Sequence, residues 1–539
     1  MDSEYPPLPS SRAAEPLPLN MSLSDGETAT QASSGSGVPL RMTNGYSQDL
    51  SKIPNQVIVE SGDLVLEYAS SKHISIDPTT AATHRWRVSS GALRESSPYF
   101  RALLDPAKFS EGREFMRQRQ LHTNSIDTGP ATNGEATGPS DDIPVPQGFP
   151  TLRLPENNVS QRLGPEIVGF FLRILSFESF SEEEKESFDV EVKNQRPSFI
   201  AGVIELADAF NSPQVVRDTL KRSQYTLGKP KLPISKFTSS MLKLNEERMR
   251  QSIFIAKFMG NRTALQMLTH AFIVVGSRFW ANGIDSPEPG SLPWHYFPGG
   301  LEEELYYRRQ CVLNTITDLQ AHFLRIYGAL EEPTPSKPSS FVGSTSAKTR
   351  QFQCRCALGN SSACDTFHLG QMTRFFSLRT KTIFIGSTLI DPDFIPDIED
   401  AEAEPRTSTE RPVDIASTIS LLKQCPDYQI DSNHTACGIR RRFLPSMDCI
   451  EGFVGDERGL LGVNQSRWHG DENRGGVGSA WPHIQGSWAN RSHRRALVMD
   501  LRLSRISGIP SMSPGGPAGE FREEDARLLF TAKKRNWEA

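Results

Sequence analysis

The residue types that could bind a metal ion are concentrated in two cysteine-containing segments of the chain. The first has the order Cys354-x-Cys356-x7-Cys364-x3-His368. Thiolate and imidazole groups are ligands that zinc prefers, but Cys-x-Cys is tighter than the usual Cys-x2-Cys, and a free cysteine is often simply a small buried apolar residue. The sequence leaves open whether these four side chains bind a metal, and we assign no metal-binding residue from it.

The second segment contains Cys425, Cys437 and Cys449, which recur at intervals of twelve residues with His434 between the first two. No zinc-site template has this regularity, so we expect these residues to be structural rather than to bind a metal or carry out redox chemistry. Cys437 and His434 could also be proposed as a catalytic nucleophile and its general base, but their closeness in sequence establishes no catalytic geometry.

The short motifs of common enzyme classes are missing from the sequence. There is no G-x-S-x-G elbow, no P-loop, no G-x-G-x-x-G after a predicted strand and no H-E-x-x-H. We therefore expect a non-enzymatic protein with no catalytic residue, no cofactor-binding residue and no cofactor. The alternative is an enzyme whose active site lies in residues 351–539.

Composition and charge narrow the class of protein. The chain has 539 residues, of which 37% are apolar, a little below the usual fraction, which indicates disordered segments beside folded domains of ordinary composition. With 59 basic and 64 acidic residues there is no global excess of positive charge, and we expect no nucleic-acid partner. Seven cysteines form an odd, sparse set, which is typical of a reducing compartment.

The sequence gives no sign of a membrane or of secretion. The N-terminal segment MDSEYPPLPSSRAAEPLPLN lacks the basic region and apolar core of a secretory signal. The most apolar later stretch, residues 264–280, contains His270 and Arg278 and is too short and too interrupted for a membrane span. We expect a cytoplasmic or nuclear protein, or one found in both compartments.

Polar stretches divide the chain. Residues 1–54 are rich in Pro, Ser, Gly and Thr and are predicted to form a disordered arm, because they cannot bury enough apolar surface to offset the entropy of ordering. The stretches at about 112–148 and at 331–350 have the same character. The sequence predicts an α+β fold with these parts: a domain over 55–225 with a disordered insertion at about 112–148, a helical region over 226–330, a linker over 331–350, and a C-terminal α+β module over 351–539 with disordered loops.

Within 55–225 the patterns predict a short sheet flanked by helices. Two β-prone runs, 57–59 and 64–66, are separated by Ser-Gly-Asp, which is typical of a strand, a turn and a strand. Pro98 is expected in the first turn of a helix, with Ser96 or Ser97 as its N-cap. A further strand is predicted over 151–154, and helices over 166–177, 199–210 and 213–220.

Several of these segments resemble the BTB/POZ domain, a protein-docking module, over about residues 57–225. The segments are GDLVL at 62–66, SPYFRALL at 97–104, TLRLPE at 151–156, the helix at 166–177 and VIELADAF at 203–210. The residues that carry the resemblance are Asp63, Leu93, Ser97, Tyr99, Phe100 and Leu103. The apolar ones would also be core residues of any α/β domain, so their apolarity alone indicates packing rather than function.

Two departures from the family pattern affect what the resemblance implies. The family's His-Lys/Arg pair falls on Ser89 and Ser90, so Asp63 lacks its basic partner, which leaves the family's usual homodimer open. A buried carboxylate without a partner costs several kcal/mol, and we expect Asp63 to be solvated, protonated or paired elsewhere. The second departure, an insertion of about 37 residues after Glu111, costs little because loop entropy grows only logarithmically with length.

Phe109-Ser110-Glu111 is similar to the hydrophobic-x-Glu motif with which adaptor members of the BTB family contact a cullin scaffold. In that interpretation Phe109 enters a groove of the cullin and Glu111 supplies a directional charge. The alternative is that Phe109 caps its own helix against the core.

The C-terminal part contains one long amphipathic helix and shorter strand patterns. Residues 301–327 place apolar side chains at spacings of 4, 3, 4 and 3, which could form a coiled-coil seam, but Arg309 interrupts it and a helix packed on its own domain is expected. Strands are predicted over 496–503 and 526–531. The pattern CPDYQIDSNHTACGIRRR at 425–442 is similar to BTB-containing proteins of filamentous fungi, and no activity follows from that resemblance.

These observations favour an adaptor that docks a protein partner through a BTB-like domain and recruits clients to a cullin-based ubiquitin ligase, while the remainder of the chain selects the client. The alternative is a BTB-linked transcriptional or chromatin regulator, which the sequence does not favour because it carries no zinc-finger or helix-turn-helix signature.

Overall fold

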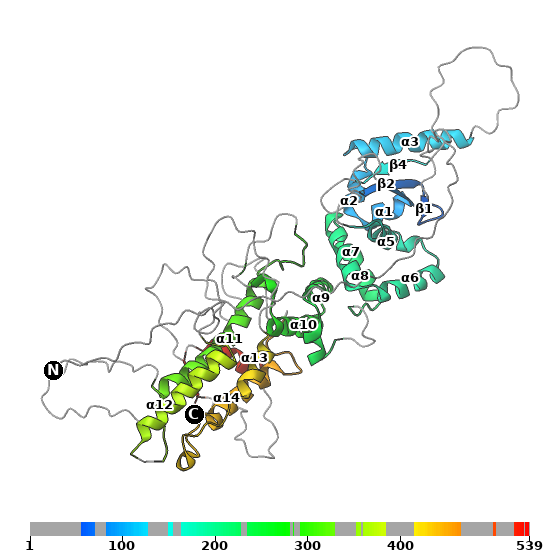
Figure 1. Ribbon diagram of the computed structural model, residues 1–539. Helices are drawn as coiled ribbons and strands as arrows, with labels where there is room; N and C mark the ends of the chain where they lie inside the picture. The colour runs from blue at the N-terminus through cyan, green and yellow to red at the C-terminus, as the bar shows by residue number, and fades with distance from the viewer. Residues whose placement is uncertain are drawn as a thin grey trace, which may run out of the picture. The chain divides into compact units, whose positions relative to one another are not determined.

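The computed structural model (Figure 1) describes residues 55–70, 82–127, 149–154, 163–227, 234–280, 284, 291–328, 352–356, 359–383, 414–464, 500–502, 522–532 and 534–537. The predicted arm over 1–54 and the predicted linker over 331–350 lie outside these residues. Among the helices of the described ranges, none has both the length and the apolar character that crossing a membrane requires.

A four-stranded sheet forms the first part of the described chain. Its order is β1 (Asn55–Val57), β3 (Ala82–Val88), β2 (Leu64–Ser70) and β4 (Thr151–Arg153). Strands β2 and β3 are antiparallel, whereas β1 runs parallel to β3 and β4 parallel to β2. The turn before β2 requires Gly62, because a Cβ there would lie 2.7 Å from the carbonyl oxygen of Val88.

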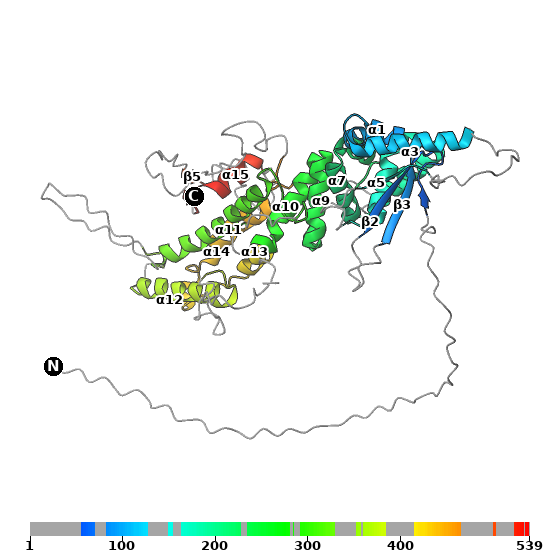
Figure 2. The ribbon, with the colours of Figure 1, turned by 90° about the horizontal axis from the view of Figure 1, so that it is seen from above.

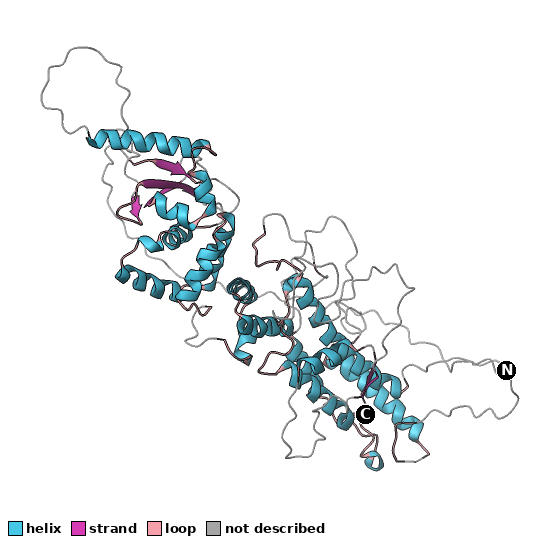
Figure 3. Ribbon diagram, turned by 180° about the vertical axis from the view of Figure 1, so that it is seen from behind, coloured by secondary structure: helices cyan, strands magenta, loops and turns pink. Residues whose placement is uncertain are grey.

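Helices flank this sheet, as Figure 3 shows. Four of them begin with proline in the first turn, where its missing N–H costs no hydrogen bond. Apolar side chains of α5, including Phe170 and Phe171, are buried in the core. The elements are α1 (Ser90–Ser96), α2 (Pro98–Leu103), α3 (Ser110–Asp127), α5 (Pro165–Leu175), η2 (Phe177–Ser179), α6 (Glu182–Asn194), α7 (Pro197–Ala209) and α8 (Pro213–Arg222).

Helix α3 corrects the prediction of a disordered insertion from residue 112. The helix runs on to Asp127, beside the edge strand β4 (Figure 1), and only residues 128–148 of the insertion lie outside the described chain. Phe115 anchors it, being 3% exposed, and the side chain of Gln118 accepts a hydrogen bond from the backbone of Thr151 at 2.8 Å. A mainly polar sequence is helical here because a single buried aromatic residue and the strand edge hold it.

The second part of the described chain is mainly helical (Figure 2). Its buried apolar side chains are part of one hydrophobic cluster. Its centre is α11 (Leu301–Ile326), which contacts α10, α12, α14 and α15. The helical region and the C-terminal module that the sequence separates therefore pack together. The other elements are η3 (Ser239–Lys243), α9 (Glu246–Met259), α10 (Arg262–Val275), η4 (Arg278–Trp280), α12 (Ser361–Arg374) with the π-helical turn η5 (Phe375–Arg379), α13 (Ile415–Lys423), η6 (Ser432–His434), α14 (Arg440–Val454), β5 (Asp500–Arg502), α15 (Glu523–Thr531) and β6 (Lys534–Asn536).

Two sequence predictions for this part have opposite outcomes. The long amphipathic helix packs inside its own domain, as expected, since Val312, Ile316 and Phe323 are buried. The strand predicted over 526–531 is wrong, because these residues belong to α15. Acidic residues in the first turn of α15 are favourable at a helix N-terminus. Leu529 and Phe530, further along the helix, are buried in the core. The described residues agree with the α+β class, since they form a helix-rich chain with the four-stranded sheet and a two-stranded parallel sheet of β5 and β6.

Candidate functional site

Phe109 lies in the turn between α2 and α3, with nearly half of its surface open to solvent. Its backbone N–H donates to the carbonyl oxygen of Asp105 at 3.2 Å, and the Asp105 side chain accepts from the backbone of Ala107 at 3.0 Å, so the turn is held by local hydrogen bonds. The side chain of Phe109 is 46% exposed. The core therefore does not enclose this ring, which is available to a partner.

Glu111 lies in the first turn of α3, two residues from Phe109. Its carboxylate accepts a hydrogen bond from the Ser110 hydroxyl at 2.8 Å. A backbone N–H and this hydroxyl lower the pKa of Glu111, and the positive end of the helix dipole also favours its charged form. Burial, together with the nearby charge of Glu111, raises the pKa of Tyr99. The structure thus brings together an exposed aromatic ring and an ionised carboxylate beside a half-buried tyrosine.

The other residues that carry the family resemblance lie in or against the core. The hydroxyl of Ser97 caps α2 by accepting from the backbone of Phe100 at 3.3 Å, and it donates to the carbonyl oxygen of Phe210 at 2.9 Å. The ring of Phe210 stacks on Phe100 with centroids 5.4 Å apart. These contacts join α2 to the end of α7. The apolar and aromatic members of the set are fully or partly buried: Leu93, Tyr99, Phe100 and Leu103.

Asp63, for which the sequence showed no basic partner, is paired with other residues. Its two carboxylate oxygens accept hydrogen bonds from the backbone N–H and the hydroxyl of Ser90, at 2.7 and 2.8 Å. The guanidinium of Arg119 lies 3.9 Å away. Because Arg119 is on α3, the inserted helix supplies a positive charge to the aspartate that the sequence left without one.

A groove of about 680 Å³ opens beside α5, α6 and α7. Charged side chains of both signs line it, among them Arg173, Glu191 and Arg196, together with the aromatic rings of Phe170 and Phe199. Its lining contains no cysteine, histidine or aspartate. The groove offers no nucleophile with an adjacent histidine base, and the expectation of a non-enzymatic protein stays a prediction.

Four candidate metal ligands from the two cysteine segments converge in the second part of the described chain. The ligand atoms of Cys354, Cys364, His434 and Cys437 all lie within 4.8 Å of one another. The Sγ atom of Cys354 is 3.4 Å from Nδ1 of His434, and Sγ of Cys437 is 3.7 Å from each of these two atoms. This arrangement of three thiols and one imidazole matches the ligand types of a Cys₃His zinc site.

Of the four residues that the sequence spacing suggested, the cluster contains Cys354 and Cys364 but not Cys356, and His368 also lies outside it. His368 is buried on α12, with its ring 5.7 Å from that of Tyr327, and burial lowers its pKa. Cys425 and Cys449 are also buried outside the cluster, where burial raises their pKa values to about 12 and about 11. Sequence reasoning missed the pairing of the two segments, although the short spacing His434-x2-Cys437 was a usable signal.

Hydrogen bonds from neighbouring elements position the cluster. The backbone N–H of Cys354 donates to the buried carboxylate of Asp365 at 3.0 Å, which ties the segment 352–356 to α12. The hydroxyl of Tyr327, at the end of α11, donates to the carbonyl oxygen of Cys437 at 2.8 Å. On the far side of the His434 ring, Nε2 is 3.1 Å from the side-chain oxygen of Asn360. That contact assigns the ring proton to Nε2 and leaves the Nδ1 lone pair facing the sulfurs.

Cys356 is a fourth thiol, at the edge of the cluster. Its Sγ lies 3.4 Å from Sγ of Cys437 and 3.0 Å from the carbonyl oxygen of Asn433. Hydrogen bonding to Cys437 and burial raise the pKa of Cys356 to about 11. Cys354 differs: although burial opposes it, hydrogen bonds from the backbone of Cys356 and from other neighbours lower its pKa to about 7. Cys354 is therefore the more acidic of the two thiols, and Cys356 keeps its proton at neutral pH.

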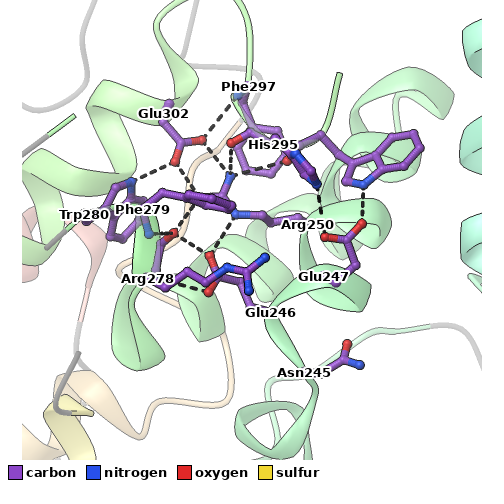
Figure 4. A network of polar contacts seen from close by, with 12 residues as sticks. Asn245, Glu246, Glu247, Arg250, Arg278, Phe279, Trp280, His295, Phe297 and Glu302 are labelled. Atoms are coloured by element: carbon purple, nitrogen blue, oxygen red, sulfur yellow. Dashed lines mark hydrogen bonds and ion pairs between the residues drawn. The ribbon is translucent and has the colours of Figure 1, made fainter. Parts of the chain in front are cut away.

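A buried ionic network lies near the start of α11 (Figure 4). The guanidinium of Arg250 forms a 2.7 Å ion pair with Glu302, and their side chains are 0% and 2% exposed. Glu302 also accepts from the indole of Trp280 at 2.7 Å, and Glu246 pairs with Arg250 at 3.0 Å. Because the buried guanidinium of Arg250 is hydrogen-bonded to the carboxylates of Glu246 and Glu302, the network joins α9, η4 and α11 and has a structural role.

Comparison with known proteins provides no family for the chain. No family model, no curated protein and no solved structure matches it.

Proposed function

We propose that the chain is a protein-interaction adaptor in which residues 55–225 act as a BTB-like docking domain. The observation that carries the proposal is the 46% exposed ring of Phe109 beside the ionised carboxylate of Glu111. Exposed aromatic side chains are the usual anchors of protein interfaces, and a neighbouring charge at the rim fixes the orientation of the partner.

The exposed part of Phe109 is large enough to matter for binding. Removing 46% of the surface of a phenylalanine from water contributes about 2 kcal/mol, at about 25 cal/mol for each Å². Glu111 adds less free energy because it stays close to solvent, but it favours a partner whose pocket has a basic rim. We propose a cullin scaffold as the partner, with the remainder of the chain selecting the client for a ubiquitin ligase.

Affinity capture tests the proposal. The full chain carries a tag, and the eluates of three forms are probed for cullins: wild type, Phe109→Ala combined with Glu111→Ala, and Leu121→Ala. Leu121 is the matched control, since it is also an exposed apolar residue and lies on α3, with 37% exposure. Wild type and Leu121→Ala should retain a cullin, and the double variant should lose it. Wild type without a cullin, or a double variant that keeps it, would overturn the proposal.

A further inference from the structure

We propose that Cys354, Cys364, Cys437 and Nδ1 of His434 bind one structural zinc ion. The observation that suggests a metal is the convergence of four ligand atoms within 4.8 Å from three separate segments of the chain. Three of the four residues are buried: Cys364, His434 and Cys437.

The spacing of the ligand atoms fits tetrahedral coordination. With Zn–S of about 2.3 Å and Zn–N of about 2.0 Å, neighbouring ligand atoms of a tetrahedron are about 3.5 to 3.8 Å apart. The three distances among Cys354, Cys437 and His434 are 3.4, 3.7 and 3.7 Å. The edges of this triangle are therefore already those of a zinc site, and Cys364 supplies the fourth ligand from α12.

A disulfide does not account for the cluster. A sulfur–sulfur bond requires about 2.0 Å, whereas the sulfurs of Cys354 and Cys437 are 3.7 Å apart, and all seven cysteines are free thiols. A disulfide would also leave His434 without a role, although its ring is fully buried with Nδ1 turned toward two sulfurs.

Hydrogen bonds with surrounding residues orient three of the four candidate ligands, as they do around known metal sites. Asn360 accepts from the far nitrogen of His434, which fixes the tautomer that can bind a metal through Nδ1. Asp365 holds the backbone of Cys354, and Tyr327 holds that of Cys437. The ligands are thus oriented from outside by three different polar side chains.

A structural role follows from the number of ligands. Four protein ligands fill a tetrahedral zinc site and leave no open position for a substrate or a catalytic water. The ion would join the segment 352–356, the first turn of α12 and the turn that precedes α14. Because the unfolded chain has no such site, zinc binding would stabilise the folded form.

The zinc content of the purified full chain tests the proposal. Mass spectrometry of the metal should give one zinc per chain for wild type, and the amount should fall at least tenfold in Cys437→Ser and in Cys364→Ser. Cys449→Ser is the matched control, a buried cysteine outside the cluster that should keep its zinc. Cys356→Ser should keep it as well. A wild-type chain that holds no zinc and takes up none from added zinc chloride would overturn the proposal, as would equal losses in the cluster and control variants.

Spectroscopy of the unmutated chain separates loss of ligands from loss of folding. X-ray absorption at the zinc edge should show three sulfur atoms at about 2.3 Å and one nitrogen at about 2.0 Å. Replacement of zinc by cobalt(II) should give the intense visible bands of tetrahedral cobalt and a thiolate charge-transfer band. A zinc ion surrounded only by oxygen and nitrogen would contradict the assignment, whatever the variants do.

Discussion

Removing the carboxylate of Glu302 should strongly destabilise the helical part of the chain. In the Glu302→Ala variant the buried guanidinium of Arg250 loses its 2.7 Å partner, and the donors of Trp280 and Phe297 lose their acceptor. Breaking a buried pair on one side typically costs about 3 to 5 kcal/mol. Since Glu246 still pairs with Arg250 at 3.0 Å, we expect a loss of about 3 kcal/mol, near the lower limit.

Urea unfolding followed by tryptophan fluorescence measures this loss. With a denaturant slope of about 3 kcal/mol/M, a loss of about 3 kcal/mol lowers the urea midpoint by about 1 M. Glu457→Ala is the matched control, because Glu457 pairs with Lys236 at 2.8 Å, almost the same distance, while the two side chains are 67% and 69% exposed. Its midpoint should not change. If Glu302→Ala shifts the midpoint no more than the control does, burial is not what makes this ion pair important.

Two further predictions concern pH and the position of α3. Burial lowers the pKa of His270 from 6.5 to about 4, and the backbone N–H of Leu461 donates to its unprotonated Nδ1. As the pH falls, the imidazole of the unfolded chain is therefore protonated before that of the folded chain. The free energy of unfolding should fall by up to about 3 kcal/mol as the pH drops from 6.5 to 4. Urea midpoints measured across this range should fall with pH in wild type and change less in His270→Asn. A wild-type midpoint that does not depend on pH would contradict the prediction. Gly112→Ala places a Cβ 2.6 Å from the carbonyl of Asp105 and should make α3 more sensitive to limited proteolysis. Gly91→Ala, whose Cβ would lie 3.6 Å from its nearest atom, should not have this effect. Equal cleavage of the two variants would refute the close packing of Gly112 against Asp105.

Periodic apolar patterns allowed much of the helical architecture to be predicted. The long helix after Leu301 was predictable because its apolar residues recur on one face, which is buried. Helix α3 was missed because its sequence is mainly polar and it is held by Phe115 and a strand edge, contacts that periodicity does not record. The error at α15 has a different cause, since the signal was in the sequence: a short apolar run is easily taken for a strand unless the acidic residues before it are recognised as a helix start.

The candidate metal site shows a different limit of sequence reasoning. Cys354 and Cys364 were noticed together because they are close along the chain, and His368 was grouped with them for the same reason. The structure replaces Cys356 and His368 with His434 and Cys437, which follow about 70 residues later. These two residues reach the cluster only because α12 and the turn before α14 pack around α11. Such ligand sets depend on tertiary packing, so the spacing of residues along the sequence identifies only some of their members.

The candidate docking residues were predicted from residue types, and the structure adds the exposure of Phe109 and the local charge of Glu111. Phe109 and Glu111 were named from the sequence, but whether the ring faced the core was undecided. The turn held by Asp105 leaves the ring 46% exposed, and Ser110 holds the carboxylate.

The most direct test of the docking proposal is calorimetry with the purified full chain and a purified cullin. Wild type and Leu121→Ala should bind with the same Kd, and Phe109→Ala should bind about 30-fold more weakly, which corresponds to about 2 kcal/mol lost from the exposed ring. An unchanged Kd in Phe109→Ala, or no binding by wild type, would contradict the account.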